Sequence, residues 1–227
     1  MPNWVFNSVV ISGEKQELER LASKLGAPVT TKTHQLSDLA MGKMDFVEIT
    51  HHNPVFSFLN VVAPTDWDAY WGEVITKEQS WVDGVFDSEA FGREFARSMA
   101  ENNDWYHWNC RNWGTKWDIA VSDGEEYSNT ILEWTDDNSL MYRFETAWSP
   151  TPQIFEILTK EFPSLHFNYE YEEETGWGGE MNWKGGVLLS ESEYDSPNSH
   201  EDYVTRGQEC ACSYEDDKEY WYEDCPK

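Results

Sequence analysis

The sequence has no long apolar run. None of its hydrophobic stretches approaches the roughly 20 residues that a membrane-spanning helix requires. The N-terminus also lacks the basic region followed by an apolar region that marks a secretory signal. We therefore expect a cytoplasmic protein. With 227 residues, the chain can form one large or two small domains around a sizeable core.

Basic residues are scarce. The chain has 16 Lys and Arg against 43 Asp and Glu, which gives a formal net charge of -27. Affinity for nucleic acid comes mainly from Lys and Arg that neutralise phosphates, so direct nucleic-acid binding is disfavoured, as is binding to anionic membranes. Such a charge attracts basic surfaces, with a steering effect that weakens as salt rises. The alternative is that the acidity only maintains solubility, although the excess is larger than solubility requires.

Recognisable catalytic motifs are absent. The sequence contains no nucleophile elbow, no phosphate-binding Gly-rich loop and no zincin motif. The carboxylates in its turns do not follow the EF-hand pattern of calcium ligands. Asp and Glu are so numerous that no pair stands out as an acid/base couple. We therefore predict that the protein is not an enzyme.

Cysteines are few, and their arrangement is not a disulfide framework. Cys110 stands alone, whereas Cys210, Cys212 and Cys225 lie near the C-terminus. Together with His200, the last three could supply thiolate and imidazole ligands to zinc. Their spacing departs from the usual pairs of ligands two to four residues apart, and the alternative is three unrelated thiols. We therefore predict no metal site and no cofactor.

Tryptophan is abundant, with 13 residues, and many of them gather between Trp105 and Pro152. Each aromatic side chain buries roughly 150–250 Å² when it packs, so we interpret this Trp-rich segment as the central core. The other interpretation is a ligand platform, on which Lys116 holds an anion and the indoles stack a base or ring. The residues of that platform are Asn112, Trp113, Lys116, Trp117 and Trp148.

Hydrophobic periodicity predicts an α+β fold. Alternation and β-branched residues predict strands at 3–12, 44–50, 54–62, 119–121, 130–134, 140–148 and 165–171. Helical spacing predicts helices at 14–25, 88–100 and 150–162, and residues 27–43 read as a loop. The strand-helix-strand order on an antiparallel sheet is the arrangement of a ferredoxin-like fold with helices on one face.

The predicted strand at 165–171 carries carboxylates on one side. Its apolar residues alternate toward the helix, whereas Glu170 and Glu172 point away from it. Two such residues lie roughly 6.6–7 Å apart, which is close to the phosphate spacing along one nucleic-acid strand. With Glu174, they could imitate a row of phosphates; the alternative is an ordinary solvated sheet face.

Three segments of the sequence resemble one protein family. They are Met1-Pro2-Asn3-Trp4 followed by Asn7 and Gly13, Asn112-Trp113-Gly114-Thr115-Lys116-Trp117-Asp118, and Thr146-Ala147-Trp148-Ser149-Pro150 before a helix. They are similar to the YubB-type (Api-like) ferredoxin-like family of small proteins found on phages and plasmids, and the resemblance spans about residues 1–185. It implies a ferredoxin-like fold in a family whose biochemical role is largely undefined.

We predict three parts: an N-terminal half with a βαβ unit at 1–104, a Trp-rich ferredoxin-like half at 105–187 and an acidic, aromatic C-terminal extension at 188–227. The hypothesis that the charge favours is a non-enzymatic inhibitor of a host nucleic-acid-binding or defence protein, such as a CRISPR or restriction nuclease, that mimics nucleic-acid charge. The predicted partner-binding residues are Glu170, Glu172, Glu174, Glu215, Asp216, Asp217 and Glu219. The alternative is a small-molecule-binding, nucleotide-binding or catalytic domain that uses the Trp-rich segment at 112–118.

Overall fold

The structure is a computed structural model of the 227-residue chain. It describes residues 3–34, 46–52, 54–67, 70, 81–82, 85–86, 105–119, 130–213 and 222–225.

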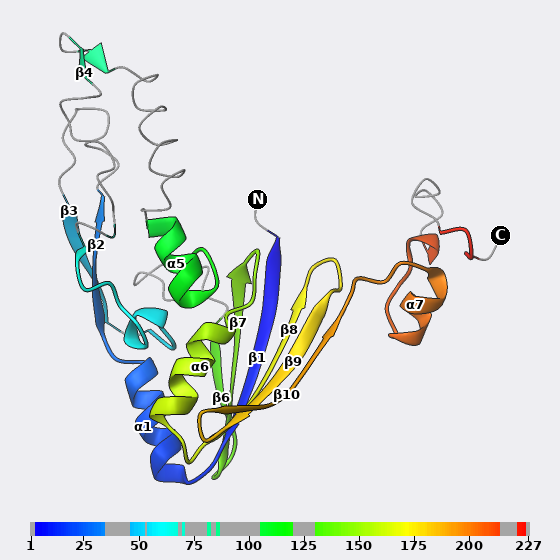
Figure 1. Ribbon diagram of the computed structural model, residues 1–227, viewed down its shortest axis with the longest axis horizontal. Coiled ribbons are helices and arrows are strands. Elements are labelled where there is room, and N and C mark those ends of the chain that lie inside the picture. The colour runs from blue at the N-terminus through cyan, green and yellow to red at the C-terminus, as the bar shows by residue number, and fades with distance from the viewer. Residues whose placement is uncertain are drawn as a thin grey trace.

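A six-stranded antiparallel sheet organises the molecule (Figure 1). Its strands are β1 (Trp4–Ser12), β6 (Ile131–Asp136), β7 (Ser139–Ala147), β8 (His166–Glu173), β9 (Gly178–Lys184) and β10 (Val187–Tyr194). The order across the sheet is β10-β9-β8-β1-β7-β6, and each strand is antiparallel to its neighbours. The first strand of the chain therefore lies in the interior of the sheet, between two strands from far along the sequence.

The connections of this sheet are those of a ferredoxin-like fold. Helix α1 (Lys15–Leu25) follows β1, and helix α6 (Pro152–Glu161) joins β7 to β8. The chain order β1-α1-β6-β7-α6-β8, with the sheet order β8-β1-β7-β6, is the βαββαβ arrangement. The predicted α+β, ferredoxin-like fold class is confirmed.

This unit crosses the boundaries expected from the sequence. The sequence predicts the ferredoxin-like part at residues 105–187, but the unit also needs β1 and α1 from the first 25 residues. Residues 26–130 are an insertion between α1 and β6. The sheet also continues through β10 into the segment expected as an extension, and α7 (His200–Thr205) follows it. Figure 1 shows α7 beyond the end of β10, far from α1 and α6.

Helices α1 and α6 cover one face of the sheet, where alternating residues of the strands are buried. The buried leucines of α1 (Leu18, Leu21 and Leu25) and the buried face of α6 pack into one core cluster with the inward residues of β1, β7 and β8. Helix α5 (Trp105–Trp113) packs beside α6. Among the helices of the described residues, none is long and apolar enough to cross a membrane.

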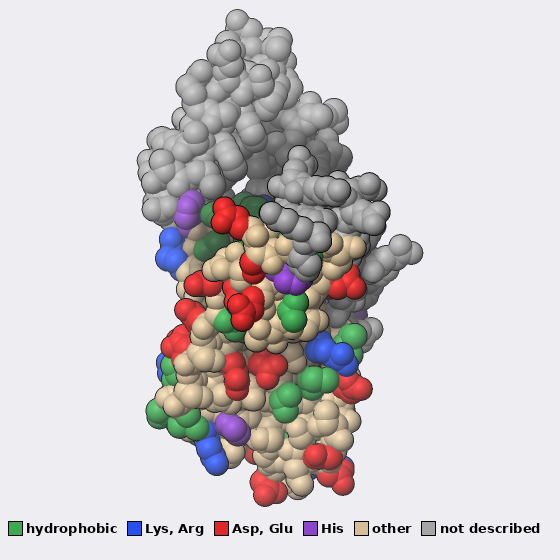
Figure 2. All heavy atoms as spheres, turned by 90° about the vertical axis from the view of Figure 1, so that its right-hand side faces the viewer, with side chains coloured by type: hydrophobic (Ala, Val, Ile, Leu, Met, Phe, Trp, Pro, Cys, Tyr) green, Lys and Arg blue, Asp and Glu red, His purple; other side chains and the backbone are tan. Residues whose placement is uncertain are grey.

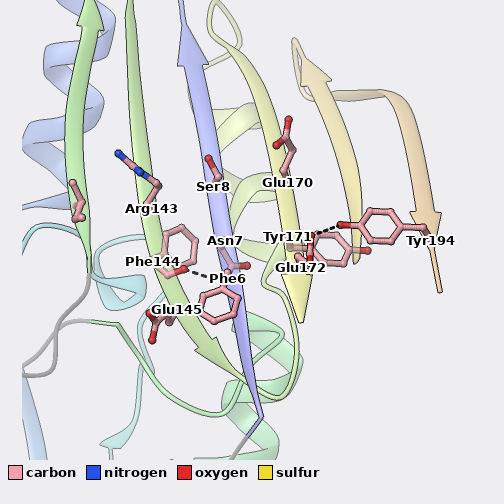
Figure 3. Close-up of a pocket in the computed structure, with 11 residues that line it drawn as sticks. Phe6, Asn7, Ser8, Arg143, Phe144, Glu145, Glu170, Tyr171, Glu172 and Tyr194 are labelled. Carbon is pink, nitrogen blue, oxygen red and sulfur yellow. Dashed lines mark hydrogen bonds between the residues drawn. The ribbon is translucent and has the colours of Figure 1, made fainter. Parts of the chain in front are cut away.

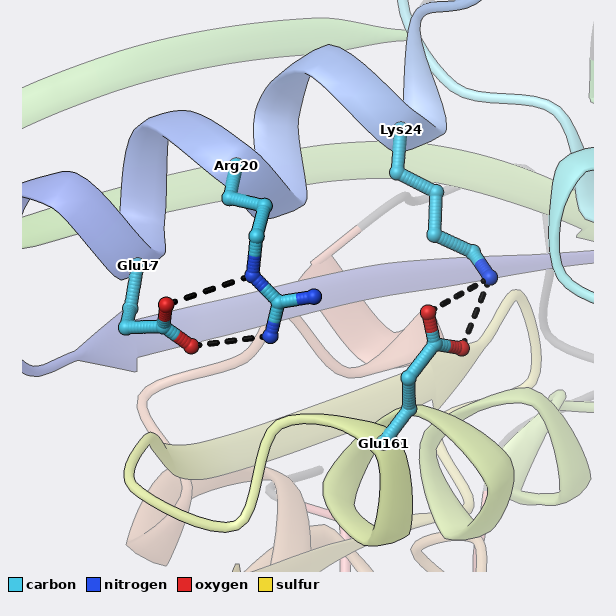
Figure 4. A network of polar contacts seen from close by, with 4 residues as sticks. All are labelled: Glu17, Arg20, Lys24 and Glu161. Atoms are coloured by element: carbon cyan, nitrogen blue, oxygen red, sulfur yellow. Dashed lines mark hydrogen bonds and ion pairs between the residues drawn. The ribbon is translucent and has the colours of Figure 1, made fainter.

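Polar contacts also fix α1 beside α6 (Figure 4). Lys24 Nζ lies 2.7 Å from Glu161 Oε2, and the guanidinium of Arg20 lies 4.0 Å from the centroid of the Phe162 ring. Within α1, Arg20 Nη2 pairs with Glu17 Oε2 at 2.9 Å. Exposed pairs of this kind stabilise a fold by about 0–1 kcal/mol each, so the buried leucines dominate the docking of α1.

The described residues of the insertion form two further pairs of strands. Two predictions made from the sequence are wrong in this region. β2 (Val29–His34) pairs with β3 (Phe46–His51), so part of the predicted loop at 27–43 is a strand. Residues 54–62 are not a strand, because Phe56 and Phe58 leave regular backbone to fill the core, and Phe58–Asn60 form a 3-10 turn. β4 (Trp81–Val82) pairs with β5 (Val85–Phe86). The predicted helix at 88–100 lies outside the described residues, as does most of the predicted strand at 119–121.

A buried polar network joins the end of α5 to the sheet. The phenol of Tyr169 on β8 donates to Asn7 Oδ1 on β1 and accepts a hydrogen bond from the backbone N–H of Thr151 at 2.9 Å. The Thr151 hydroxyl donates to the Trp113 carbonyl at the end of α5. Asn7 Nδ2 donates to Thr146 Oγ1 at 3.0 Å. Residues of the resembled motifs thus hold the insertion against the sheet.

Candidate functional site

The face of the sheet opposite the helices is open among the described residues, and it contains a groove of about 450 Å³. The groove is lined by residues of β1, β6, β7, β8 and β10 (Figure 3). Outward positions of a half-covered sheet are usually polar. Here Phe6, at 50% exposure, and Ile131, at 50%, leave apolar surface in water. An uncovered apolar surface in a concave face is a candidate binding site.

Phe6 lies between two carboxylates. Its cross-strand neighbours are Glu145 on β7 and Glu172 on β8. Directly opposite residues of antiparallel strands have Cβ atoms about 4.5–5.5 Å apart, so both carboxylates flank the ring at close range. Figure 3 shows the three side chains on the same face of the sheet. The arrangement offers an apolar contact bordered by negative charge.

The next row of the groove continues this pattern around Ser8. Ser8 lies between Arg143 on β7 and Glu170 on β8. Arg143 Nη2 forms an ion pair with Glu133 Oε2 at 2.7 Å, which offsets its positive charge. The lining residues thus comprise three carboxylates against one guanidinium that is already paired. Figure 2, viewed from the side of α7, shows more acidic than basic side chains over the described surface.

Tyr194 on β10 lines one end of the groove. Its ring reaches over Gly178, where a Cβ atom would lie 2.6 Å from the phenolic oxygen, and the phenol donates to Glu172 Oε2 at 3.1 Å. Gln208 Nε2 donates to the other oxygen of Glu172 at 3.1 Å. Burial and the Glu172 carboxylate raise the pKa of Tyr194 to about 12, so the phenol remains a donor at neutral pH. These contacts fix the Glu172 carboxylate in place.

The structure brings some of the predicted partner-binding residues together. Glu170 and Glu172 both lie on the open face, with the orientation expected from alternation. Glu174 follows the end of β8 in the turn before β9, where it is exposed. The remaining predicted residues, Glu215, Asp216, Asp217 and Glu219, lie outside the described residues.

Glu173, which is not among the site residues predicted from the sequence, is a buried carboxylate in phase with the helix-facing residues of β8. Its side chain accepts hydrogen bonds from Asn3 Nδ2 at 2.6 Å and from the backbone N–H of Thr175 at 2.7 Å. Burial by itself would raise the pKa of Glu173, but the hydrogen bonds from Thr175, Asn3 and Trp177 outweigh burial and lower it. Its role is to close the β8–β9 turn and to anchor the start of β1. In the sequence Glu173 is one of several consecutive glutamates. Only the alternation of inward and outward residues along the strand could have indicated that its side chain is buried.

A second hollow, of about 350 Å³, lies in the insertion, and half of its lining residues are aromatic. Trp113 and Trp117 from the predicted ligand platform line it, together with Trp67, Tyr70 and Trp105. Trp113 is only 2% exposed and donates its indole N–H to the Val62 carbonyl at 3.0 Å. The core interpretation of the Trp-rich segment therefore holds for Trp113.

The platform residues Asn112, Lys116 and Trp148 do not line this hollow. Asn112 bonds the Trp108 carbonyl of its own helix at 2.8 Å. Lys116 Nζ lies between the Trp117 and Trp148 rings, at 4.3 and 4.4 Å from their centroids. These two indoles are 40% and 44% exposed, so the core interpretation fails for them. The five residues do not converge on one cavity.

Three polar side chains that line the second hollow, those of Asp118, Tyr70 and Asn109, have protein partners. The Asp118 carboxylate accepts from the backbone N–H of Phe58 at 2.7 Å and from Ser57 Oγ at 2.6 Å. Tyr70 donates to Asn109 Oδ1 at 3.0 Å, and burial raises the pKa of Tyr70 to about 12. These groups orient the insertion against the core, and the aromatic rings offer a surface on which a ligand could stack.

A family model agrees with this fold. Residues 116–206 match the family model described as a ferredoxin-like domain in Api92-like protein. Among solved structures, the protein api92 from Yersinia pseudotuberculosis is similar, with 11% sequence identity and a TM-score of 0.41 over 87% of this chain and 100% of that chain. No curated protein matches the sequence. The match over residues 116–206 confirms the resemblance of the sequence to the Api-like ferredoxin-like family.

Proposed function

We propose that the protein is a non-enzymatic interaction protein that binds a basic surface of a nucleic-acid-binding protein through the open face of its sheet. The observation that carries the proposal is the position of Phe6, an exposed apolar ring between the carboxylates of Glu145 and Glu172. An apolar centre with a charged border is the usual composition of a protein interface. The negative border selects a partner rich in Lys and Arg.

The spacing of the carboxylates supports mimicry of nucleic-acid charge. Glu170 and Glu172 project from the same face of β8, at positions two residues apart. A strand rises about 3.3 Å per residue, so their spacing is close to that of successive phosphates on one strand. The net charge of -27 adds long-range attraction toward basic surfaces. A host defence nuclease in the cytoplasm, such as a CRISPR or restriction nuclease, has the basic nucleic-acid channel that this surface would occupy.

The aromatic hollow of the insertion supports a second candidate function, the binding of a flat apolar or aromatic small molecule. Trp67, Trp105 and Trp113 supply stacking surfaces there. A thermal-shift screen of nucleosides and aromatic compounds tests it. If a compound raises the melting temperature of the wild type but not of Trp105→Ala, this second function gains support; if no compound does, it is contradicted.

The main proposal is tested by capture of host proteins with charge-matched variants. Glu170→Gln/Glu172→Gln removes two charges from the groove, and Glu19→Gln/Glu156→Gln removes two exposed charges from the helices on the other face. We expect wild type and the helix control to retain the same nucleic-acid-binding protein at low salt, and the groove variant to retain it poorly. Capture should fall as salt rises.

The expected loss of affinity in the groove variant follows from the free energy of exposed ion pairs. Each contributes up to about 1 kcal/mol, so loss of two pairs weakens binding roughly tenfold. Equal retention by the groove variant and the helix control would show that only total charge matters and would contradict a site on the open face. Retention of proteins with no basic surface would contradict the proposed partner.

A further inference from the structure

The C-terminal segment brings four metal-binding side chains together, although they are spread over 26 positions of the sequence, from 200 to 225. One ligand atom each of His200, Cys210, Cys212 and Cys225 can be chosen so that all four lie within 4.8 Å of one another. Cys210 Sγ is 3.7 Å from Cys225 Sγ, and Cys212 Sγ is 3.2 Å from His200 Nδ1. We propose that this cluster is a structural zinc site with three thiolate ligands and one imidazole ligand.

The distances match a tetrahedral site better than a disulfide. With Zn–S bonds of about 2.3 Å, two thiolates of a regular tetrahedron lie about 3.75 Å apart. The observed separation of 3.7 Å between Cys210 Sγ and Cys225 Sγ is that edge length, whereas a disulfide would require about 2.05 Å. For a thiolate and an imidazole nitrogen the expected edge is about 3.5 Å, and the pair Cys212–His200 lies 0.3 Å from it at 3.2 Å.

Local hydrogen bonds hold the four ligands in this arrangement. His200 is the first residue of α7, and the Asp224 carboxylate accepts from its backbone N–H at 2.9 Å and from that of Glu201 at 3.1 Å. Asp224, the residue before Cys225, therefore links this part of the chain to the start of α7. The 3-10 turn at Ala211–Ser213, closed by the Ser213 N–H to the Cys210 carbonyl at 2.9 Å, brings Cys210 and Cys212 close together.

The surrounding segment has little buried apolar surface of its own. Among residues 195–210, 212–213 and 222–225, for which burial is described, only Pro197, Cys210 and Cys225 are buried. Helix α7 buries none of its residues, and Val204 is 61% exposed. None of the cysteines belongs to the core cluster under the sheet. A small unit without an apolar core requires a staple, and a bound metal supplies one.

The ligand types select the metal and its role. Three thiolates with one imidazole favour zinc among the common divalent ions, because thiolates are soft ligands. Protein side chains fill all four positions, so the site is structural and leaves no position open for a substrate. The metal would hold Cys212 and Cys225 together, and the chain between them carries four of the predicted partner-binding acids.

The test is the metal content of the full-length chain, purified under reducing conditions and measured by mass spectrometry of the metal. We expect one zinc per chain in wild type and in Cys110→Ser, because Cys110 lies on α5 away from the cluster. Cys210→Ser and Cys225→Ser should lose the zinc. His200→Cys should keep it, because four thiolates also form a closed tetrahedral site. Cobalt in place of zinc should give thiolate-to-metal charge-transfer absorption.

A separate measurement distinguishes loss of a zinc ligand from unfolding of the core. Near-ultraviolet circular dichroism of the tryptophans reports on the core under the sheet, which the cluster does not share. Absence of zinc from wild type, or equal zinc in Cys210→Ser, would overturn the proposal. So would a disulfide between Cys210 and Cys225 in the reduced preparation, detected as a mass 2 Da lower.

Discussion

Replacement of Tyr169 by phenylalanine removes one oxygen atom from the buried network that joins α5 to the sheet. The phenol donates to Asn7 Oδ1 and accepts from the Thr151 N–H, and Tyr169 is 0% exposed. Both partners would then be buried without a hydrogen bond from this position. Burial also raises the pKa of Tyr169, so the group donates as a neutral phenol at neutral pH.

The expected cost is large for a single atom. A buried polar group that loses its partner costs about 1–3 kcal/mol, and two such groups give a loss of about 2–4 kcal/mol in the free energy of unfolding, because Asn7 keeps its other hydrogen bonds. Globular domains have a total stability of about 5–15 kcal/mol, so the loss is easily measured.

Tyr142 supplies a matched control. It is also 0% exposed, but its hydroxyl has no hydrogen-bond partner among the described residues. Tyr142→Phe makes the same chemical change and removes an unsatisfied group, so it should leave stability unchanged or raise it by up to about 1 kcal/mol. Urea unfolding followed by tryptophan fluorescence measures both variants. Equal losses in the two variants would refute the network as the cause.

Two further predictions concern the β8–β9–β10 edge of the sheet. A Cβ atom at Gly179 would lie 2.6 Å from the phenolic oxygen of Tyr171, so Gly179→Ala should lower stability by about 1–3 kcal/mol in urea unfolding, and an unchanged midpoint would contradict the observed packing. The pKa of Glu173 is lowered in the folded state, so its contribution is present above the unfolded pKa of about 4.3 and is lost as pH falls through the folded pKa. Glu173→Gln should therefore be less stable than wild type at pH 7 by about 1–2 kcal/mol, with a difference that shrinks below about pH 4; a difference that grows with acid would contradict this sign.

The sheet strands with strict alternation were predictable from sequence. In β8 the expected inward and outward residues are those observed, because one face of this strand is buried and the other is not. Helix α6 was predictable because Pro152 marks its first turn and Ile154, Phe155 and Leu158 repeat at helical spacing. Such signals are local, so they can be recognised without knowing which other segments the strand or helix packs against.

Structural features that depend on contacts with distant segments could not be predicted from the sequence. Residues 54–62 look like a strand because they are apolar, but the core that takes up Phe56 and Phe58 is built from β7 and α6, far along the chain. The position of β1 between β7 and β8 likewise rests on pairing across more than a hundred residues. The cysteine cluster was disfavoured on spacing alone, since only the turn at Ala211–Ser213 and the contacts of Asp224 bring its members together.

The proposed mimicry is tested most directly by competition between this protein and DNA for the purified partner. The partner's binding to labelled duplex DNA would be titrated with wild type, with Glu170→Gln/Glu172→Gln and with Phe6→Ser, at several salt concentrations. The account predicts that wild type displaces the DNA, that both variants do so roughly tenfold less well, and that the difference for Phe6→Ser persists at high salt because its contact is apolar. If the partner binds wild type and DNA simultaneously, or if both variants compete as well as wild type, the open face is not a substitute for nucleic acid.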